Sequence, residues 1–405
     1  MREPLQTGVL VGAAVVLSVV AALVQPEAAA PEIMSDQGEA FYPKFTDPQA
    51  PRSIEVIDYD EATATARPFQ VQFQRGRWLI ASHHHYPVDA GERMAKTAAA
   101  LIDLRKDLVR SDSPADHAQF GVVDPLDQKV SGLAGRGKRV TLRDGRGEVL
   151  ADFILGRSVD GKPGYRYVRV PGAKRVYAVK TDADPSARFA DWVDAGLLRI
   201  AASSIRKVTI NSYSIDEAMG RLNNLETLVL AQEKDQWKRE GSAKFNVAPV
   251  KAMAAALDGL KVAGAQPKPQ AMAEDLKQGQ VRMSLETAMA LRQKGFFLAP
   301  TGRMYANEGE MVVETADGLL YSLRFGEVAT TAGEAKPVAG GGENRYLFAT
   351  VNFDAARAAR YGGDAAAGQR RARELNRRFA DWFYIIAGAD FQKLRLRRKD
   401  VAGGH

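Results

Sequence analysis

The chain has 405 residues, of which 45% are hydrophobic and 26% are charged, a composition typical of two or three folded domains rather than of a disordered protein. Its 56 basic and 49 acidic residues leave a formal net charge of +7, which is too evenly balanced to predict nucleic-acid binding. Because cysteine is absent, disulfides, thiol catalysis and cysteine-ligated metal centres are excluded.

The N-terminal part of the chain predicts a membrane anchor. Residues 7–24, TGVLVGAAVVLSVVAALV, carry no charge, and a helix of this length rises about 27 Å, close to the hydrocarbon thickness of a bilayer. The basic Arg2 precedes the run and acidic residues follow it, so residues 1–6 are expected in the cytoplasm and the bulk of the chain outside it. A signal peptide cleaved near residues 28–30 is the alternative. The proline-rich residues 25–51 predict an extended linker.

The rest of the chain is interpreted as one α+β unit that occurs twice, each copy an antiparallel sheet with packed helices. The first repeat is expected over residues 52–203 and the second over residues 204–400, with residues 401–405 as a tail. Each half opens with a run of alternating apolar and polar residues that predicts a half-buried strand. A hairpin follows in each half, and its second arm holds Trp78 or Trp237.

A helix is predicted after each of these hairpins. In the first half, Asp89 is expected to cap the helix, with Glu92 three residues later, and in the second half Asn246 is expected to act as the cap. Both halves then place an Asp-Gly turn between alternating runs, at Asp144 and at Asp317, which predicts a second hairpin.

The pentapeptide RFADW occurs at residues 188–192 and again at residues 378–382. We interpret it as a helix that ends each repeat, with its phenylalanine and tryptophan filling the same core position in both copies. A helix from Ser284 and the glycine-rich residues 330–344 are expected as insertions in the second copy. The basic residues 391–400, FQKLRLRRKD, alternate in polarity and predict an edge strand.

The segments RGRWLIASHHHYPVDAGERM, at residues 75–94, and TADGLLYSLRFGE, at residues 315–327, together with the anchor and the repeat, resemble a known family. That family is the uncharacterised two-repeat domain of unknown function 4340, often encoded beside gliding-motility-type ABC transporters. The resemblance implies a non-catalytic accessory or scaffolding subunit, anchored in the bacterial inner membrane with its bulk in the periplasm. Its expected partners are an ABC-type permease or other envelope proteins. The alternative is an extracytoplasmic solute- or glycan-binding protein that uses the cleft between the repeats.

One motif has the spacing of a phosphate-binding loop, with Gly132, Gly137 and Lys138 matching G-x-x-x-x-G-K. However, Arg139 stands where the magnesium-binding serine or threonine should be, and a strand rather than a helix is predicted to follow. We therefore interpret the motif as a basic loop before a strand.

The triplet His83, His84 and His85 is the candidate for metal binding. Neighbouring side chains of an extended chain point to opposite sides, so at most two of the three imidazoles can reach one metal. Asp89 or His117 would have to complete such a site. We predict an exposed connector here and leave a metal-dependent hydrolase as a further alternative.

The aspartates of the two pentapeptides, Asp191 and Asp381, are expected to make hydrogen bonds at helix ends rather than to form a carboxylate pair. We assign no catalytic, cofactor-binding or metal-binding residue, and we predict that the protein is not an enzyme.

Overall fold

The computed structural model describes most of the chain beyond its N-terminal segment. The described residues are 36–130, 132–193, 196–216, 221–233, 236–242, 244–282, 284–329 and 342–403. The transmembrane helix predicted at residues 7–24 lies outside them. Among the helices of the described residues, none is both long and apolar enough to cross a bilayer.

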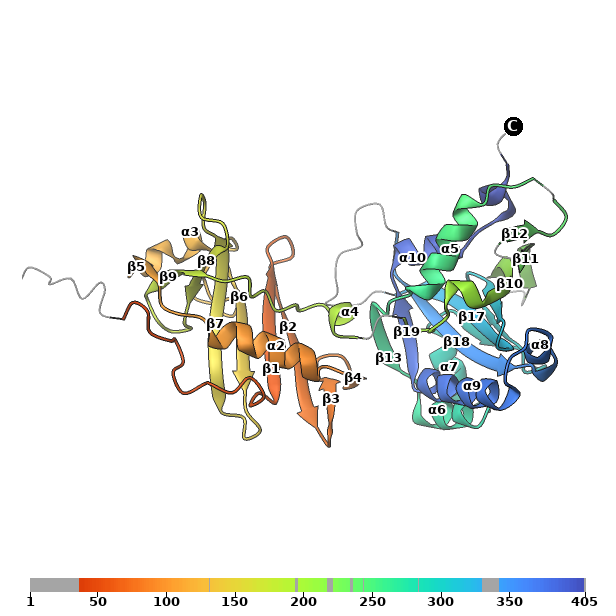
Figure 1. Ribbon diagram of the computed structural model, residues 1–405, viewed down its shortest axis with the longest axis horizontal. Coiled ribbons are helices and arrows are strands. Elements are labelled where there is room, and N and C mark those ends of the chain that lie inside the picture. The colour runs from red at the N-terminus through yellow and green to blue at the C-terminus, as the bar shows by residue number, and fades with distance from the viewer. Residues whose placement is uncertain are drawn as a thin grey trace, which may run out of the picture.

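Two lobes, each built on one antiparallel sheet, make up the described chain (Figure 1). This confirms a mixed α+β fold with antiparallel sheets and several helices. The strands of the first sheet are β1 (Ser53–Asp60), β2 (Thr65–Gln74), β3 (Arg77–Ile80), β4 (Tyr86–Val88), β5 (Leu108–Ser111), β6 (Lys138–Arg143), β7 (Val149–Ser158), β8 (Tyr165–Arg169) and β9 (Val176–Lys180). They lie in the order β4-β3-β2-β1-β6-β7-β8-β9-β5. The helices of this lobe are α2 (Gly91–Ile102), α3 (His117–Phe120) and α4 (Phe189–Trp192).

The second lobe holds a similar sheet and more helices. Its strands are β10 (Ile205–Asp216), β11 (Arg221–Glu233), β12 (Gln236–Arg239), β13 (Gly264–Pro267), β16 (Glu310–Thr315), β17 (Leu319–Val328), β18 (Arg345–Phe353) and β19 (Trp382–Ile386). They lie in the order β12-β11-β10-β16-β17-β18-β19-β13, and β14 (Phe296–Leu298) pairs separately with β15 (Met304–Ala306). The helices are α5 (Ala248–Asp258), α6 (Gln270–Lys277), α7 (Leu285–Arg292), α8 (Ala355–Arg360), α9 (Ala365–Ala380) and α10 (Gly388–Leu394).

Apart from the edge strand β4, the two sheets have the same strand order and comparable registers. Trp78 lies opposite Phe73 in the β2–β3 pair, and Trp237 lies opposite Gln232 in the β11–β12 pair. The register also shifts at matching places, after Leu155 in the β7–β8 pair and after Phe325 in the β17–β18 pair. The two tryptophans therefore occupy corresponding positions in the two sheets.

A glycine marks each of these register shifts, because the chain that joins β5 to β6, or β13 to β16, crosses the strand at that point. A Cβ atom on Gly156 would lie 2.5 Å from the carbonyl oxygen of Phe120. A Cβ atom on Gly326 would lie 2.0 Å from the carbonyl oxygen of Lys294. Since only glycine lacks a Cβ atom, the sequence must place it at both crossings.

The two RFADW pentapeptides do not occupy corresponding positions, so that prediction is wrong. Residues 188–192 follow β9 and form α4, where Phe189 and Trp192 are both buried. Residues 378–382 come before β19, the counterpart of β9, because they end α9 and begin that strand. The helices α8 and α9 lie between β18 and β19, whereas only a short turn joins β8 to β9.

Three further predictions about local structure are corrected. Residues 391–400 form no edge strand; they complete α10 and continue into a 3-10 helix, because Phe391 and Leu394, one helical turn apart, are both buried. Asp89 does not cap α2, which begins after Ala90 without a side-chain cap. The described part of the linker packs against the first lobe rather than extending freely, since Phe45 is buried in its core.

Asn246 is not the cap residue of α5 either, because Val247 holds that position without a side-chain cap. The Oδ1 atom of Asn246, one residue earlier, accepts a hydrogen bond of 3.0 Å from the backbone N–H of Ala248. The helix predicted from Ser284 is confirmed. The side chain of Ser284 caps α7 by accepting a hydrogen bond from the backbone N–H of Thr287. Residues 330–341 of the predicted glycine-rich insertion lie outside the described residues.

Candidate functional site

The two lobes meet around Tyr86, the first residue of the edge strand β4. The Tyr86 ring lies with its centroid 5.1 Å from that of Phe189 and 4.8 Å from that of Trp382. Nearby, Nη2 of Arg371 donates a 2.6 Å hydrogen bond to the backbone carbonyl of Arg199. Both pentapeptides thus contribute an aromatic ring to this junction, although they occupy different positions in the fold.

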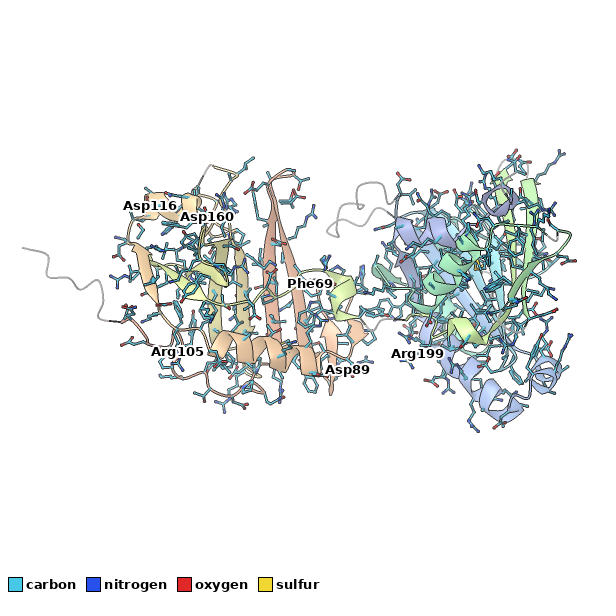
Figure 2. All side chains as sticks on the ribbon, turned by 45° about the horizontal axis from the view of Figure 1, so that its top comes forward. Phe69, Asp89, Arg105, Asp116, Asp160 and Arg199 are labelled. Carbon is cyan, nitrogen blue, oxygen red and sulfur yellow. The ribbon has the colours of Figure 1, made fainter. Side chains whose placement is uncertain are left out.

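A pocket of about 380 Å³ opens at this junction, and we call it the junction pocket. Figure 2 shows two of its lining residues, Asp89 and Arg199, on the two sides of the junction. Its aromatic lining residues are Tyr86, Trp382 and Tyr384, and its charged ones are Asp89, Arg199, Glu374, Arg378 and Asp381. Aromatic faces beside hydrogen-bonding charged groups suit a polar ligand that also offers a flat apolar face.

The hydroxyl groups and charges of this pocket are held by neighbouring atoms. The Tyr384 hydroxyl donates a 2.8 Å hydrogen bond to the backbone carbonyl of Arg378. Burial raises the pKa of Tyr384 well above its usual value, so this hydroxyl keeps its proton at neutral pH. The Asp381 carboxylate pairs with Nζ of Lys277 at 2.6 Å. These two groups are therefore held in fixed positions, where they can hydrogen-bond to a polar ligand.

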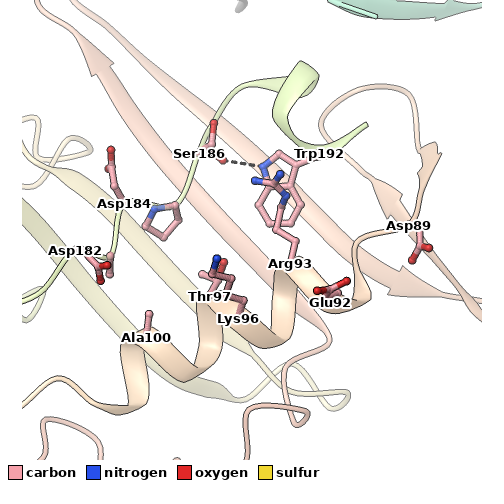
Figure 3. A pocket seen from close by; sticks show the side chains of 12 residues that line it. Asp89, Glu92, Arg93, Lys96, Thr97, Ala100, Asp182, Asp184, Ser186 and Trp192 are labelled. Carbon is pink, nitrogen blue, oxygen red and sulfur yellow. Dashed lines mark hydrogen bonds between the residues drawn. The ribbon is translucent and has the colours of Figure 1, made fainter. Parts of the chain in front are cut away.

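A second concave surface, the α2 groove, lies between α2 and the chain that runs from β9 to α4 (Figure 3). Its volume is about 600 Å³. Trp192 closes one end, where its Nε1 atom donates a 2.9 Å hydrogen bond to the carbonyl of Ser186 and the Arg93 guanidinium lies 5.6 Å from its ring centroid. The charged lining residues are Asp89, Glu92, Arg93, Lys96, Asp182 and Asp184. This mixture of charges favours neither an anionic nor a cationic ligand.

The histidine triplet forms the turn between β3 and β4. His84 and His85 are exposed and adopt left-handed φ angles of 55° and 57°, so the chain is tightly turned here rather than extended. His83 lies half-buried, with its ring centroid 5.2 Å from that of Phe189. His117 is engaged elsewhere, with Nε2 at 2.8 Å from the carbonyl oxygen of Lys174. In the part of the chain that the structure describes, no group of three histidine, aspartate or glutamate side chains is placed to hold a metal ion.

The phosphate-loop spacing leads into a strand, as the sequence predicts. Lys138 is the first residue of β6, and its Nζ atom lies 2.6 Å from the carboxylate of Asp184. The pentapeptide aspartates are also engaged with separate partners. Asp191 accepts a 2.6 Å hydrogen bond from the Ser186 hydroxyl and pairs with Arg188, at the start of its helix.

Sequence reasoning missed Tyr86 as a junction residue. It lies directly after the histidine triplet, and no local pattern distinguishes it from any other strand tyrosine. Its proximity to Trp382 depends on how the second lobe packs against β4, which local sequence does not encode.

Comparison with known proteins finds one family model that matches part of the chain, and that family has no described activity. Residues 78–279 match the model of a family described as Domain of unknown function (DUF4340). This stretch begins in β3 and ends after α6, so it takes in parts of both lobes. No curated protein and no solved structure matches the chain. Over residues 78–279 the chain is therefore similar to the domain of unknown function DUF4340.

Proposed function

We propose that the protein is a non-catalytic accessory or scaffolding subunit of an ABC-type transport or gliding-motility-like complex. In this proposal it is anchored in the bacterial inner membrane by residues 7–24, and its two lobes lie in the periplasm. The uncharged N-terminal run and the family resemblance support this location and these partners. The matching strand orders support an origin by duplication of one unit.

An apolar pair on the surface of α7 carries this proposal. Leu285 and Met289 are 77% and 55% exposed, and they lie four residues apart on one side of the helix. The buried residues of α7 are Thr287 and Leu291. Exposed apolar side chains that share one helix face are typical of a contact surface for another protein. We infer that this face of α7 packs against the partner.

The test is recovery of the partner from solubilised membranes. Full-length protein should co-purify with a permease or another envelope protein, and the double variant Leu285→Glu with Met289→Glu should lose that partner. The matched control is Leu222→Glu with Leu225→Glu, since both leucines are exposed on β11 of the same lobe. Exposed substitutions of this kind change the free energy of unfolding by about 0.5 kcal/mol or less, so both variants should stay folded. Recovery of the wild-type protein alone, under conditions that preserve other complexes, would contradict the proposal.

The junction pocket favours a second candidate function, binding of a solute or glycan. The half-exposed ring of Trp382 beside charged side chains is the observation behind it, because sugars stack on aromatic rings and hydrogen-bond to charged neighbours. Calorimetric titration of the full chain with the neutral sugar chitotetraose tests this candidate. Trp382→Ala should abolish binding, whereas Trp237→Ala, on the edge strand β12, should not. Failure of the wild-type chain to bind would remove this candidate and leave the first untouched.

A further inference from the structure

The second lobe has a pocket of about 520 Å³, separate from the junction pocket. It lies between strands β17 and β18, helix α9 and the chain that joins β13 to β16, which we call the β13–β16 connection. This connection holds α6, α7, β14 and β15, and α6 and α9 lie close together in Figure 1. The β5–β6 connection of the first lobe contains a 3-10 helix and α3 instead. We call this cavity the connection pocket.

The walls of the connection pocket combine apolar side chains with polar groups. Its large apolar lining residues are Leu276, Val281, Leu298, Met304, Phe348 and Phe379. Phe348 and Met304 also belong to the apolar cluster between the connection and the sheet. A cavity of this size with such walls can accept an aliphatic chain or a ring.

One wall carries a guanidinium group that is largely, but not fully, buried. The side chain of Arg324, on β17, is 15% exposed. Its Nε atom donates a 3.0 Å hydrogen bond to the carbonyl of Met304 and lies 3.6 Å from Oε2 of Glu310, while Nη1 lies 3.4 Å from the hydroxyl of Thr350. Partners on β15, β16 and β18 thus fix the plane of the guanidinium group.

The charges around the pocket do not balance. Oε1 of Glu310 accepts a 2.9 Å hydrogen bond from Nη2 of Arg303, so one carboxylate serves two guanidinium groups. Glu310 also accepts a 3.3 Å hydrogen bond from the amide of Asn211. Among the described residues that line the pocket, Arg303 and Arg324 are charged and none is acidic. The cluster therefore keeps one positive charge that a bound anion can neutralise.

The first lobe also has an arginine in the corresponding strand pair, but at the neighbouring position on β8 rather than on β7. Ile154 occupies the corresponding place, two residues before Gly156, as Arg324 lies two residues before Gly326. Ile154 packs in a small apolar cluster with Val122 and Val176. Burying a guanidinium group is costly, and replacing buried ion pairs by apolar side chains is often neutral or stabilising. Arg169, which lies opposite Ile154 in the β7–β8 pair, is buried and donates to the backbone carbonyls of Val122 and Ala173. Arg324 differs from it because it shares the carboxylate of Glu310 with Arg303 at the wall of a pocket.

We propose that the connection pocket binds a small organic anion in which one carboxylate is joined to an apolar chain or ring. The carboxylate lies against Arg324 and Arg303, and the apolar part lies against Leu276, Leu298 and Phe348. This site is independent of the partner surface on α7 and of the junction pocket.

Calorimetric titration of the full chain, held in an amphipathic polymer, tests the site with octanoate as the probe. Octanoate should bind, and octan-1-ol, which has the same chain without the charge, should bind at least tenfold more weakly. Arg324→Gln should weaken octanoate binding by at least tenfold. Arg169→Gln is the matched control, because Arg169 is a buried arginine of the first lobe whose Nε and Nη1 atoms donate to backbone carbonyls.

Three results would overturn the proposal. The first is no octanoate binding up to about 5 mM, which corresponds to less than about 3 kcal/mol of binding free energy. The second is equal affinity for octanoate and octan-1-ol. The third is unchanged affinity in Arg324→Gln. If that variant fails to fold, Gln280→Trp replaces it, since Gln280 is an exposed lining residue where added bulk obstructs the pocket. Octanoate binding should then be lost, and unchanged binding would equally refute the site.

Discussion

Replacing Gly326 by alanine should be among the most destabilising single changes in the second lobe. The added Cβ atom would lie 2.0 Å from the carbonyl oxygen of Lys294 and 2.8 Å from Cζ of Phe296. The Lys294 carbonyl is itself fixed by a 2.9 Å hydrogen bond from the backbone N–H of Glu327. The crossing chain must therefore move away, which breaks this bond and displaces a buried ring. Overpacking against such atoms costs about 3 kcal/mol of unfolding free energy.

The same change at Gly156 should have a similar but smaller effect, because its nearest contact is 2.5 Å from the carbonyl oxygen of Phe120. The assay is urea denaturation of the full chain followed by circular dichroism. Gly145→Ala is the control, since its Cβ atom would meet nothing closer than 3.5 Å, at Cγ of Arg52. It should stay within about 1 kcal/mol of the wild type. A cost below about 1 kcal/mol at either crossing would refute the argument that both connections pass directly over a glycine.

Three further predictions concern other parts of the chain. Burial lowers the pKa of Lys268 from 10.5 to about 7. Between these pH values the unfolded chain therefore holds a proton that the folded chain has lost, and unfolding free energy should rise with pH. The urea denaturation midpoint of the wild type should be higher at about pH 9.5 than at about pH 6, and this difference should disappear in Lys268→Met. An equal rise in both proteins would contradict the prediction. Asn376→Leu should cost about 2 kcal/mol in thermal unfolding, because the amide both accepts from and donates to the backbone of Val351, at 2.9 and 2.6 Å. Trp382→Ala removes the ring contact with Tyr86 and should increase the radius of gyration in X-ray scattering, whereas an unchanged radius would show that the junction does not depend on that ring.

The strands and hairpins shared by both lobes could be predicted because their pattern is local. Alternating polarity marks a strand that buries one face, and this held for β1 and β10 and for the hairpins that contain Trp78 and Trp237. The short strands β13, β14 and β15 were missed. Each has three or four residues, which is too short to show a period.

The pentapeptide misled because five residues encode a local preference and not a position in a fold. Phe189 and Trp192 share one face of α4, as the spacing predicts. In the second pentapeptide, Phe379 lies in the last turn of the long helix α9 and Trp382 begins β19. The difference arises because α8 and α9 stand directly before β19 in the chain. Identical letters therefore take different conformations according to the chain that precedes them.

The candidate sites were harder to predict than the sheets. A cleft between the repeats was expected, but its rings come from β4 and β19, which only tertiary packing brings together. Arg324 lies between Leu323 and Phe325 in an alternating strand, and that pattern predicts a side chain facing water. The prediction fails because the β13–β16 connection covers this face of the second sheet.

The β13–β16 connection, which covers Arg324, is also where the second lobe differs most from the first. Both sheets bury the same strands in the same order, so their common features account for folding in either lobe. The exposed pair on α7 and about half of the residues that line the connection pocket belong to the β13–β16 connection instead. In the first lobe the arginine of this strand pair, Arg169, lies opposite Ile154 and donates to backbone carbonyls. In the second lobe Arg324 instead shares Glu310 with Arg303 at the wall of the connection pocket, which fits the proposed binding of an anion there.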